Sequence, residues 1–202
     1  MFFVFEGIDG SGKSTQARRL AESLRAASKT VVTVREPGGT ALGERIRELL
    51  FEPGSEGMAA ETELFLFMAA RSHLVKTRIA PALAAGEIVI SDRFLWSSVA
   101  YQGAAGTVPT EEILRMGLLA VADAPVALTL VIDVDPRLAH ARATGRNRME
   151  ERGLGFQERV REGFQKLVAA HGESAVLIDG DGSEDEVHAR VLAALPEGVC
   201  DA

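Results

Sequence analysis

Short runs of mostly apolar residues recur along the chain, and longer stretches with helical periodicity separate them. Nearly continuous apolar runs are typical of strands that are buried on both faces, as in a parallel sheet. Their alternation with helices predicts an α/β fold in which helices cover both faces of the sheet. The five predicted strands are Phe2–Phe5, Thr30–Val34, Glu87–Ile90, Ala127–Ile132 and Ala175–Ile178.

The stretches between the strands predict helices of different lengths. In the longest one, Pro81 is expected to kink or end the helix, because proline lacks the N–H that an interior position needs. The helix that begins at Phe156 places apolar residues on a single side, so that side is expected to face the core. The predicted helices are Lys13–Ala27, Leu42–Leu50, Thr62–Ala85, Arg93–Gln102, Thr110–Val121, Pro136–Thr144, Phe156–Ala170 and Glu184–Leu195.

A glycine-rich loop directly follows the first strand and has the spacing G-x-x-x-x-G-K-S. Its glycines let successive backbone N–H groups turn toward phosphate oxygens, and the following helix presents its N-terminus to the same anion. Lysine in this motif reaches the β- and γ-phosphates, and the serine hydroxyl can bind Mg²⁺. The motif predicts a P-loop NTPase-type three-layer α/β/α fold. The loop comprises Gly7, Ile8, Asp9, Gly10, Ser11, Gly12, Lys13 and Ser14, with Thr15 next.

A P-loop identifies a phosphate binder without fixing its reaction. Switches that hydrolyse GTP read guanine with an Asn-Lys-x-Asp stretch. The one asparagine of this chain, Asn147, is followed by Arg148. The sequence therefore favours a kinase that transfers a phosphoryl group to a small acceptor.

The third predicted strand ends in Asp92 and Arg93. In open parallel sheets, ligands bind at the carboxyl ends of the strands. Asp92 could hold Mg²⁺ through water, while the planar guanidinium of Arg93 could clamp an acceptor phosphate. The alternative is an ion pair on the surface at the strand end.

Phe67 and Arg71 lie four residues apart and therefore on one side of the longest predicted helix. An aromatic ring beside a guanidinium can stack on a base and donate to its edge. As isolated residues, Phe67 would rather be ordinary core and Arg71 the partner of an acid such as Glu63.

Arg142, Arg146 and Arg148 occupy the end of a predicted helix and the glycine-containing stretch after it. Positive charge around the transferred group is the main demand of phosphoryl transfer, and a lid closing over ATP can supply it. With Glu150 and Glu151 nearby, the charge pattern alone instead favours a solvated charged helix.

Composition and charge exclude several other classes. The formal net charge of −7 and the pI near 5.2 argue against a nucleic-acid partner, because such partners select basic surfaces. Cys200 is the one cysteine, which suits a reducing compartment. We recognise neither a signal peptide nor an apolar run of membrane-spanning length, so we expect a cytoplasmic protein without membrane contact.

The ordered motifs together resemble the thymidylate kinase family over about residues 2–180. Arg35–Thr40, with the sequence REPGGT, is similar to that family's bacterial motif after the second strand and is more specific than a P-loop. The other matching segments are Phe5–Gln16, Phe67–Arg71, Asp92–Phe94 and Ala100–Gly103.

This resemblance implies a fold like that of nucleoside monophosphate kinases, with residues 1–202 as one domain and a lid at about 142–155. It implies transfer of the ATP γ-phosphoryl group to dTMP with Mg²⁺, in a homodimer. Phe67 would stack on thymine, Arg71 would bind the base edge and Arg93 the phosphate. Asp9 would lie near the 3′-hydroxyl, and Tyr101 would exclude a ribose 2′-hydroxyl. The implied acceptor residues are Asp9, Glu36, Phe67, Arg71, Arg93, Ser98, Tyr101 and Gln102.

The P-loop departs from the eukaryotic branch of the family because Ile8, Asp9, Gly10 and Ser11 include no basic residue. The resemblance then assigns the catalytic arginine to the lid, with Arg142, Arg146 and Arg148 as candidates, beside Lys13, Asp9 and Arg93. Two alternatives stay open: a kinase of the same fold for another nucleoside monophosphate or a deoxynucleoside, and a nucleotide-binding regulatory module without transfer chemistry.

Overall fold

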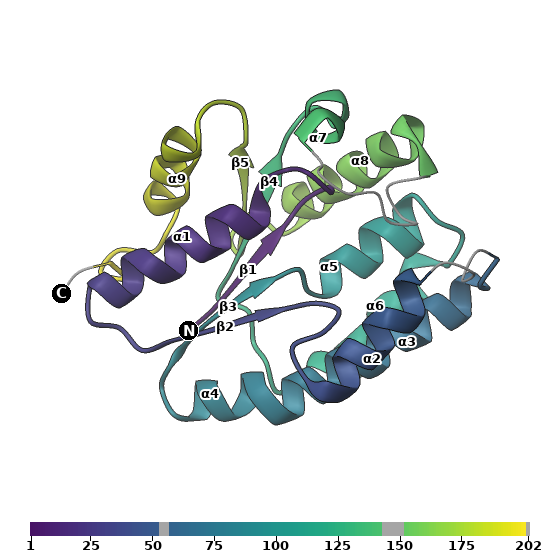
Figure 1. Ribbon diagram of the computed structural model, residues 1–202, viewed down its shortest axis with the longest axis horizontal. Helices are drawn as coiled ribbons and strands as arrows, with labels where there is room; N and C mark the ends of the chain where they lie inside the picture. The colour runs from purple at the N-terminus through teal and green to yellow at the C-terminus, as the bar shows by residue number, and fades with distance from the viewer. Residues whose placement is uncertain (53–56, 143–151, 201–202) are drawn as a thin grey trace.

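The predicted strands form one five-stranded parallel sheet with the order β2-β3-β1-β4-β5 (Figure 1). The computed structural model describes residues 1–52, 57–142 and 152–200. Each observed strand lies within a residue or two of its predicted position. The α/β class and the parallel sheet are therefore confirmed. The strands are β1 Phe2–Glu6, β2 Val31–Arg35, β3 Ile88–Asp92, β4 Leu128–Asp133 and β5 Ala175–Asp179.

Helices cover both faces of the sheet, with α1 and α9 on one face and the α3, α6 and α8 group on the other (Figure 1). The α-helices are α1 Lys13–Ala26, α2 Ala41–Phe51, α3 Ala60–Leu74, α4 Ala80–Ala84, α5 Leu95–Ser98, α6 Thr110–Val121, α7 Pro136–Arg142, α8 Leu154–Ala170 and α9 Glu184–Ala193. Two π-helical segments, η1 Val75–Ile79 and η2 Val99–Ala104, continue α3 and α5.

Alternate side chains of the central strand β1 enter two separate cores. Phe3 and Phe5 pack with α1 and α9, whereas Phe2 and Val4 pack with α3 and α6. This alternation follows from the two-residue period of a strand. Because both faces are covered, β1 is held rigidly and delivers the glycine-rich loop at a fixed place.

Two predicted helices have different boundaries in the structure. The predicted helix Thr62–Ala85 consists of α3, η1 and α4, which follow one another without a break, and Pro81 comes just after the π-helical segment η1, where the hydrogen-bond pattern of the helix changes. The predicted helix Arg93–Gln102 begins only at Leu95, because Arg93 adopts a left-handed backbone with φ of 71°. A turn therefore separates β3 from α5.

Helix α8 packs its predicted apolar side into a third core. Phe156, Val160 and Phe164 are buried there, as the helical spacing predicts. Near the end of α8, the ring of His171 lies 5.3 Å from that of Trp96 on α5, measured between ring centroids. The end of α8 is thus in contact with the segment that follows the β3 turn.

No helix in the described part of the chain combines the length and the apolar character needed to cross a membrane.

Candidate active site

The glycine-rich loop joins the end of β1 to the start of α1. Gly7, Gly10 and Gly12 have positive φ values of 138°, 78° and 92°, which glycine adopts without strain. A Cβ at Gly7 would lie 2.5 Å from the oxygen of Ile132, and one at Gly10 would overlap the oxygen of Ala139, whereas one at Gly12 would meet no atom within 4 Å. Gly7 and Gly10 are packed against the scaffold, and Gly12 borders open space at the N-terminus of α1, as a phosphate site requires.

Lys13 folds back over this loop. Its Nζ donates to the carbonyl oxygen of Ile8 at 3.2 Å and lies 3.8 Å from Oδ1 of Asp9. Burial and the neighbouring Arg93 guanidinium lower the pKa of Lys13, although nearby carboxylates oppose the shift. The ammonium group is therefore held inside the loop, next to the place where phosphate oxygens would bind.

Ser14 and Asp92 meet across the ends of the loop and β3. The Ser14 hydroxyl donates to Oδ2 of Asp92 at 2.5 Å. The other carboxylate oxygen, Oδ1, is buried and has no hydrogen-bond partner within the described residues. Mg²⁺ selects hard oxygen ligands and keeps several of its waters, so a hydroxyl and one carboxylate suit it. These two predicted metal-binding residues fit the ion.

Arg93 links the loop to the neighbouring pocket. Its guanidinium donates to Asp9 Oδ1 at 2.5 Å, to the carbonyl oxygen of Gly7 at 3.1 Å and to the Tyr101 hydroxyl at 3.3 Å. Tyr101 in turn donates to Asp9 Oδ2 at 3.1 Å. Burial opposes ionisation of Asp9, but Arg93 and Lys13 hold its pKa below its usual range. Asp9, Arg93 and Tyr101 therefore form one charged cluster.

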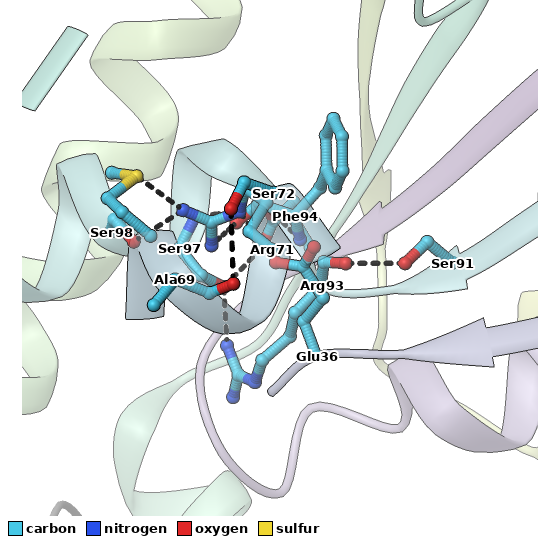
Figure 2. A network of polar contacts seen from close by, with 11 residues as sticks. Glu36, Ala69, Arg71, Ser72, Ser91, Arg93, Phe94, Ser97 and Ser98 are labelled. Carbon is cyan, nitrogen blue, oxygen red and sulfur yellow. Dashed lines mark hydrogen bonds and ion pairs between the residues drawn. The ribbon is translucent and has the colours of Figure 1, made fainter. Parts of the chain in front are cut away.

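Arg71 is almost completely buried, and each of its three guanidinium nitrogens donates at least one hydrogen bond (Figure 2). Nε donates to Glu36 at 2.7 Å, Nη1 to Ser98 Oγ at 3.1 Å and to the sulfur of Met68 at 3.3 Å, and Nη2 to the Phe94 carbonyl at 2.9 Å. The acid partner of Arg71 is therefore Glu36, and the alternative pairing with Glu63 is wrong.

The carboxyl group of Glu36 has a raised pKa. Burial raises its pKa to about 7, and the ion pair with Arg71 only partly offsets this rise. Its second oxygen, Oε1, is buried and has no hydrogen-bond partner within the described residues. The Glu36 carboxyl group thus presents a free acceptor position within the pocket that Arg71 helps to line.

One pocket collects all of the acceptor residues that the resemblance implies, since Asp9, Glu36, Phe67, Arg71, Arg93, Ser98, Tyr101 and Gln102 line it together. Sequence reasoning missed other lining residues, namely Pro37, Arg47, Phe51 and Ser97. Arg47 donates to the Pro37 carbonyl at 2.9 Å and lies 5.1 Å from the centre of the Phe51 ring. An arginine and an aromatic residue four apart on one helix were the signal that could have identified this pair.

Gln102 connects the pocket to the beginning of α8. Its amide donates to Glu63 Oε1 at 2.7 Å, and Arg152 donates to Glu63 Oε2 at 3.1 Å. Because Glu63 is buried on α3, it fixes the orientation of the Gln102 amide. Glu63 therefore supports the pocket without being one of its lining residues.

The predicted lid arginines are only partly within the described residues. Arg142 ends α7 and donates to the carbonyl oxygen of Gly180 at 3.2 Å, after β5. Arg146 and Arg148 lie outside the described residues, as does most of the predicted lid segment.

A P-loop with an adjoining pocket that holds several arginines and aromatic rings defines the class of P-loop kinases acting on small phosphorylated acceptors. The comparisons with known proteins narrow this class. The family model described as thymidylate kinase matches residues 5–191, and the chain belongs to the thymidylate kinase family.

Individual relatives agree with this assignment over nearly the whole chain. A thymidylate kinase from Dinoroseobacter shibae is 48% identical, covering 95% of this chain and 94% of the relative. One from Ruegeria pomeroyi is 45% identical, covering 95% and 92%. The crystal structure of thymidylate kinase from Ehrlichia chaffeensis superposes with a TM-score of 0.80 at 35% identity, covering 97% of this chain and 98% of that one. The family resemblance drawn from the sequence motifs is confirmed.

Proposed function

We propose that this chain transfers the γ-phosphoryl group of ATP to dTMP, giving dTDP and ADP. An oxygen of the acceptor phosphate bonds to the γ-phosphorus as the bond between that phosphorus and the leaving ADP oxygen breaks. A nucleotide phosphate is largely ionised at neutral pH, so positioning and charge neutralisation are the main demands on the protein.

The contact of Arg93 with the P-loop is the observation that supports this reaction best. Arg93 lies in the acceptor pocket and donates to the Gly7 carbonyl at 3.1 Å. A phosphate held by Arg93 would therefore approach a phosphate held by the loop amides. In this proposal the binding of the acceptor phosphate replaces part of the Arg93 pairing with Asp9.

We assign recognition of the base to the part of the pocket that Phe67 and Arg71 line. Phe67 is partly exposed in the pocket and offers a ring face for stacking. Arg71 is oriented by Glu36 and Phe94, so its charge is already placed when the base arrives. Ser98 and Gln102 supply further polar contacts, and Tyr101 occupies the space beside Asp9.

The donor side consists of the glycine-rich loop with Lys13, Ser14 and Thr15. Ser14 and Asp92 would hold Mg²⁺, for the reasons given above. When bound, the ion supplies positive charge to the phosphate oxygens. Lys13 neutralises charge on the β- and γ-phosphates from inside the loop.

The lid and the assembly complete the proposal. We treat residues 1–202 as one domain with a lid at about 142–155, and Arg142, Arg146 and Arg148 as candidates for charge at the γ-phosphate. We also expect a homodimer in the cytoplasm, in keeping with the family and with the single cysteine. Exposed apolar side chains on the neighbouring helices α3 and α6 favour such a dimer, namely Phe65, Leu118 and Leu119.

A coupled assay of ADP release tests the reaction and its acceptor. With ATP and Mg²⁺ present, dTMP is expected to exceed dUMP, dGMP, CMP and thymidine in kcat/KM. If kcat/KM is much higher for another monophosphate or for thymidine, that compound takes the place of dTMP as the proposed acceptor. ADP release that no acceptor stimulates would favour the regulatory module instead.

The Lys13→Ala variant tests the donor side. We expect kcat to fall by about 10³-fold, because the lysine charge acts on the transferred group. Circular dichroism should show an unchanged fold. Near-normal turnover would remove Lys13 from the catalytic assignment.

A further inference from the structure

Glu6 is a fully buried carboxylate that the proposed reaction does not use directly. It is the last residue of β1, with 0% of its surface exposed, and it immediately precedes the glycine-rich loop. A charged carboxylate is costly to bury unless donors surround it. The partners of Glu6 therefore indicate its purpose.

Within the described residues, the Glu6 carboxylate accepts three hydrogen bonds, and all of them come from the segment that follows Arg93. Oε1 accepts the backbone N–H of Phe94 at 2.9 Å and that of Ser97 at 3.0 Å. Oε2 accepts the Ser97 hydroxyl at 2.5 Å. Glu6 thus fixes the start of α5 to the end of the central strand.

Ser97 extends this contact to the guanidinium of Arg93. Because the hydroxyl donates its proton to Glu6, its lone pairs are free to accept, and Nη1 of Arg93 donates to it at 2.9 Å. The chain Glu6–Ser97–Arg93 therefore orients the same Nη1 that donates to the Gly7 carbonyl.

The backbone of Arg93 needs this support. Its φ of 71° lies in the left-handed region, which costs a residue with a side chain about 1–2 kcal/mol. Its N–H donates to Phe5 and its carbonyl accepts the Ser91 hydroxyl at 2.6 Å (Figure 2). The hydrogen bond from Phe94 N–H to Glu6 fixes the next peptide. The turn is consequently held on both sides.

We infer that Glu6 is a positioning residue for the acceptor phosphate, acting through Ser97 and the Phe94 backbone to aim the Arg93 guanidinium at the P-loop. This inference rests on the proposed function, because it assumes that Arg93 holds that phosphate. It assigns the selectivity for a phosphorylated acceptor partly to a residue that does not line the pocket.

Glu6→Gln is the sharpest single test. Glutamine retains one oxygen for the two backbone N–H groups but places an NH₂ group against the Ser97 hydroxyl. The Ser97 hydroxyl would then have no acceptor for its own proton, because both the new amide and Arg93 donate to it, and the negative charge behind this chain of hydrogen bonds would be lost. We expect the affinity for dTMP to fall by about tenfold or more, as for a lost charge-assisted hydrogen bond.

Thymidine provides the readout that a merely structural role would not alter selectively. Thymidine lacks the phosphate but presents the same base and sugar, so its Kd in the Glu6→Gln variant should stay within about twofold of wild type. Calorimetric titration gives both Kd values, and kinetics should show a raised KM for dTMP with an unchanged KM for ATP. Equal losses for dTMP and thymidine, or no loss for either, would overturn the inference.

Ser97→Ala keeps the test decisive if Glu6→Gln does not fold. This variant keeps the carboxylate and its hydrogen bonds from the backbone N–H groups, and it removes the hydroxyl that joins Glu6 Oε2 to Arg93 Nη1. It should also weaken dTMP more than thymidine, and an unchanged ratio of the two Kd values would contradict the relay.

Asp133→Asn is a matched control at the end of the neighbouring strand β4. Asp133 accepts two hydrogen bonds from Arg161, at 2.7 and 2.8 Å, and two longer ones from Gln165, so the side-chain partners of its carboxylate in the described part of the chain lie on α8. The ratio of the Kd values for dTMP and thymidine should stay at the wild-type value. Failure of wild type to phosphorylate dTMP would refute the proposed function itself, whereas normal dTMP selectivity in both the Glu6 and Ser97 variants would refute only this inference.

Discussion

Arg71 combines the charge of a surface residue with the burial of a core residue. Only 2% of its surface is exposed, and its guanidinium contacts Glu36, Met68, Ser98 and Phe94. A planar group with several donors can satisfy such a set of partners, while a lysine ammonium cannot reach them together. The identity of this residue is therefore tied to the shape of its site as well as to its charge.

Arg71→Lys should consequently impair the acceptor selectively. We expect kcat/KM for dTMP to fall by about tenfold to a hundredfold, because buried acceptors lose their partners. The KM for ATP should change little. Arg115→Lys, on the exposed face of α6, is the matched control. An unaltered preference among dTMP, dGMP and CMP would argue against base recognition by Arg71.

Glu36 predicts a dependence of stability on pH. Its pKa is about 7 in the folded protein against about 4.5 when exposed, so between these values the folded state retains a proton that the unfolded state releases. The resulting stabilisation is complete below pH 4.5 and is lost as the pH rises through 7. Urea unfolding of wild type and of the Glu36→Gln variant, compared at each pH, isolates the contribution of Glu36 to the stability. The stability of wild type relative to the variant should fall by about 2–3 kcal/mol from pH 5 to pH 8, and a constant difference would contradict the raised pKa.

Among the elements, α8 and η2 are in close contact, and this contact supports one wall of the pocket. A Cβ at Gly163 of α8 would lie 2.8 Å from Cβ of Ala104 and 3.5 Å from Cα of Ala100. Because η2 also carries Tyr101 and Gln102, a larger side chain at position 163 would displace these two pocket residues.

Gly163→Ala should therefore destabilise the protein by about 1–3 kcal/mol through overpacking and weaken dTMP binding. Gly155→Ala is the control on the same helix, where a Cβ would have only the Arg159 guanidinium nearby, at 4.0 Å. That change should be neutral or stabilising by up to about 1 kcal/mol. Thermal unfolding and calorimetry measure both effects, and equal behaviour of the two variants would contradict this account of the contact.

The sequence predicted the secondary-structure elements and the motifs more accurately than the contacts between the elements. The strands and the P-loop depend on local patterns, so Lys13 and Ser14 could be placed from their order alone. The acid partner of Arg71 depends on the approach of α3 to the segment after β2, which periodicity does not encode.

The left-handed turn at Arg93 was missed for a similar reason, because Glu6, Phe5 and Ser91 impose it from other positions in the fold. Arg47 belongs to none of the matching motifs, and only its spacing of four residues from Phe51 marks it in the sequence.

At the scale of the whole molecule, exposed apolar side chains on α3 and α6 predict where two copies of the chain meet. Leu119 is 84% exposed and Leu118 is 65% exposed, and Phe65 on the adjacent helix is 59% exposed. Leu119→Asp should convert the expected homodimer to a monomer by placing a charge in the buried interface. Light scattering after size-exclusion chromatography measures the mass. Leu177→Asp, on the edge strand β5, should leave the dimer intact. A monomeric wild type, or a dimeric Leu119→Asp variant, would contradict this placement of the interface.

The contact between Trp96 and His171 gives the molecule a built-in optical reporter. Trp96 is the single tryptophan of the chain, and it follows the Arg93 turn at the start of α5. Its emission therefore arises from one known place, a few residues from the guanidinium assigned to the acceptor. Nucleotide titrations of the unlabelled protein can follow that signal, and a response to dTMP that thymidine does not elicit would locate the change at the turn itself.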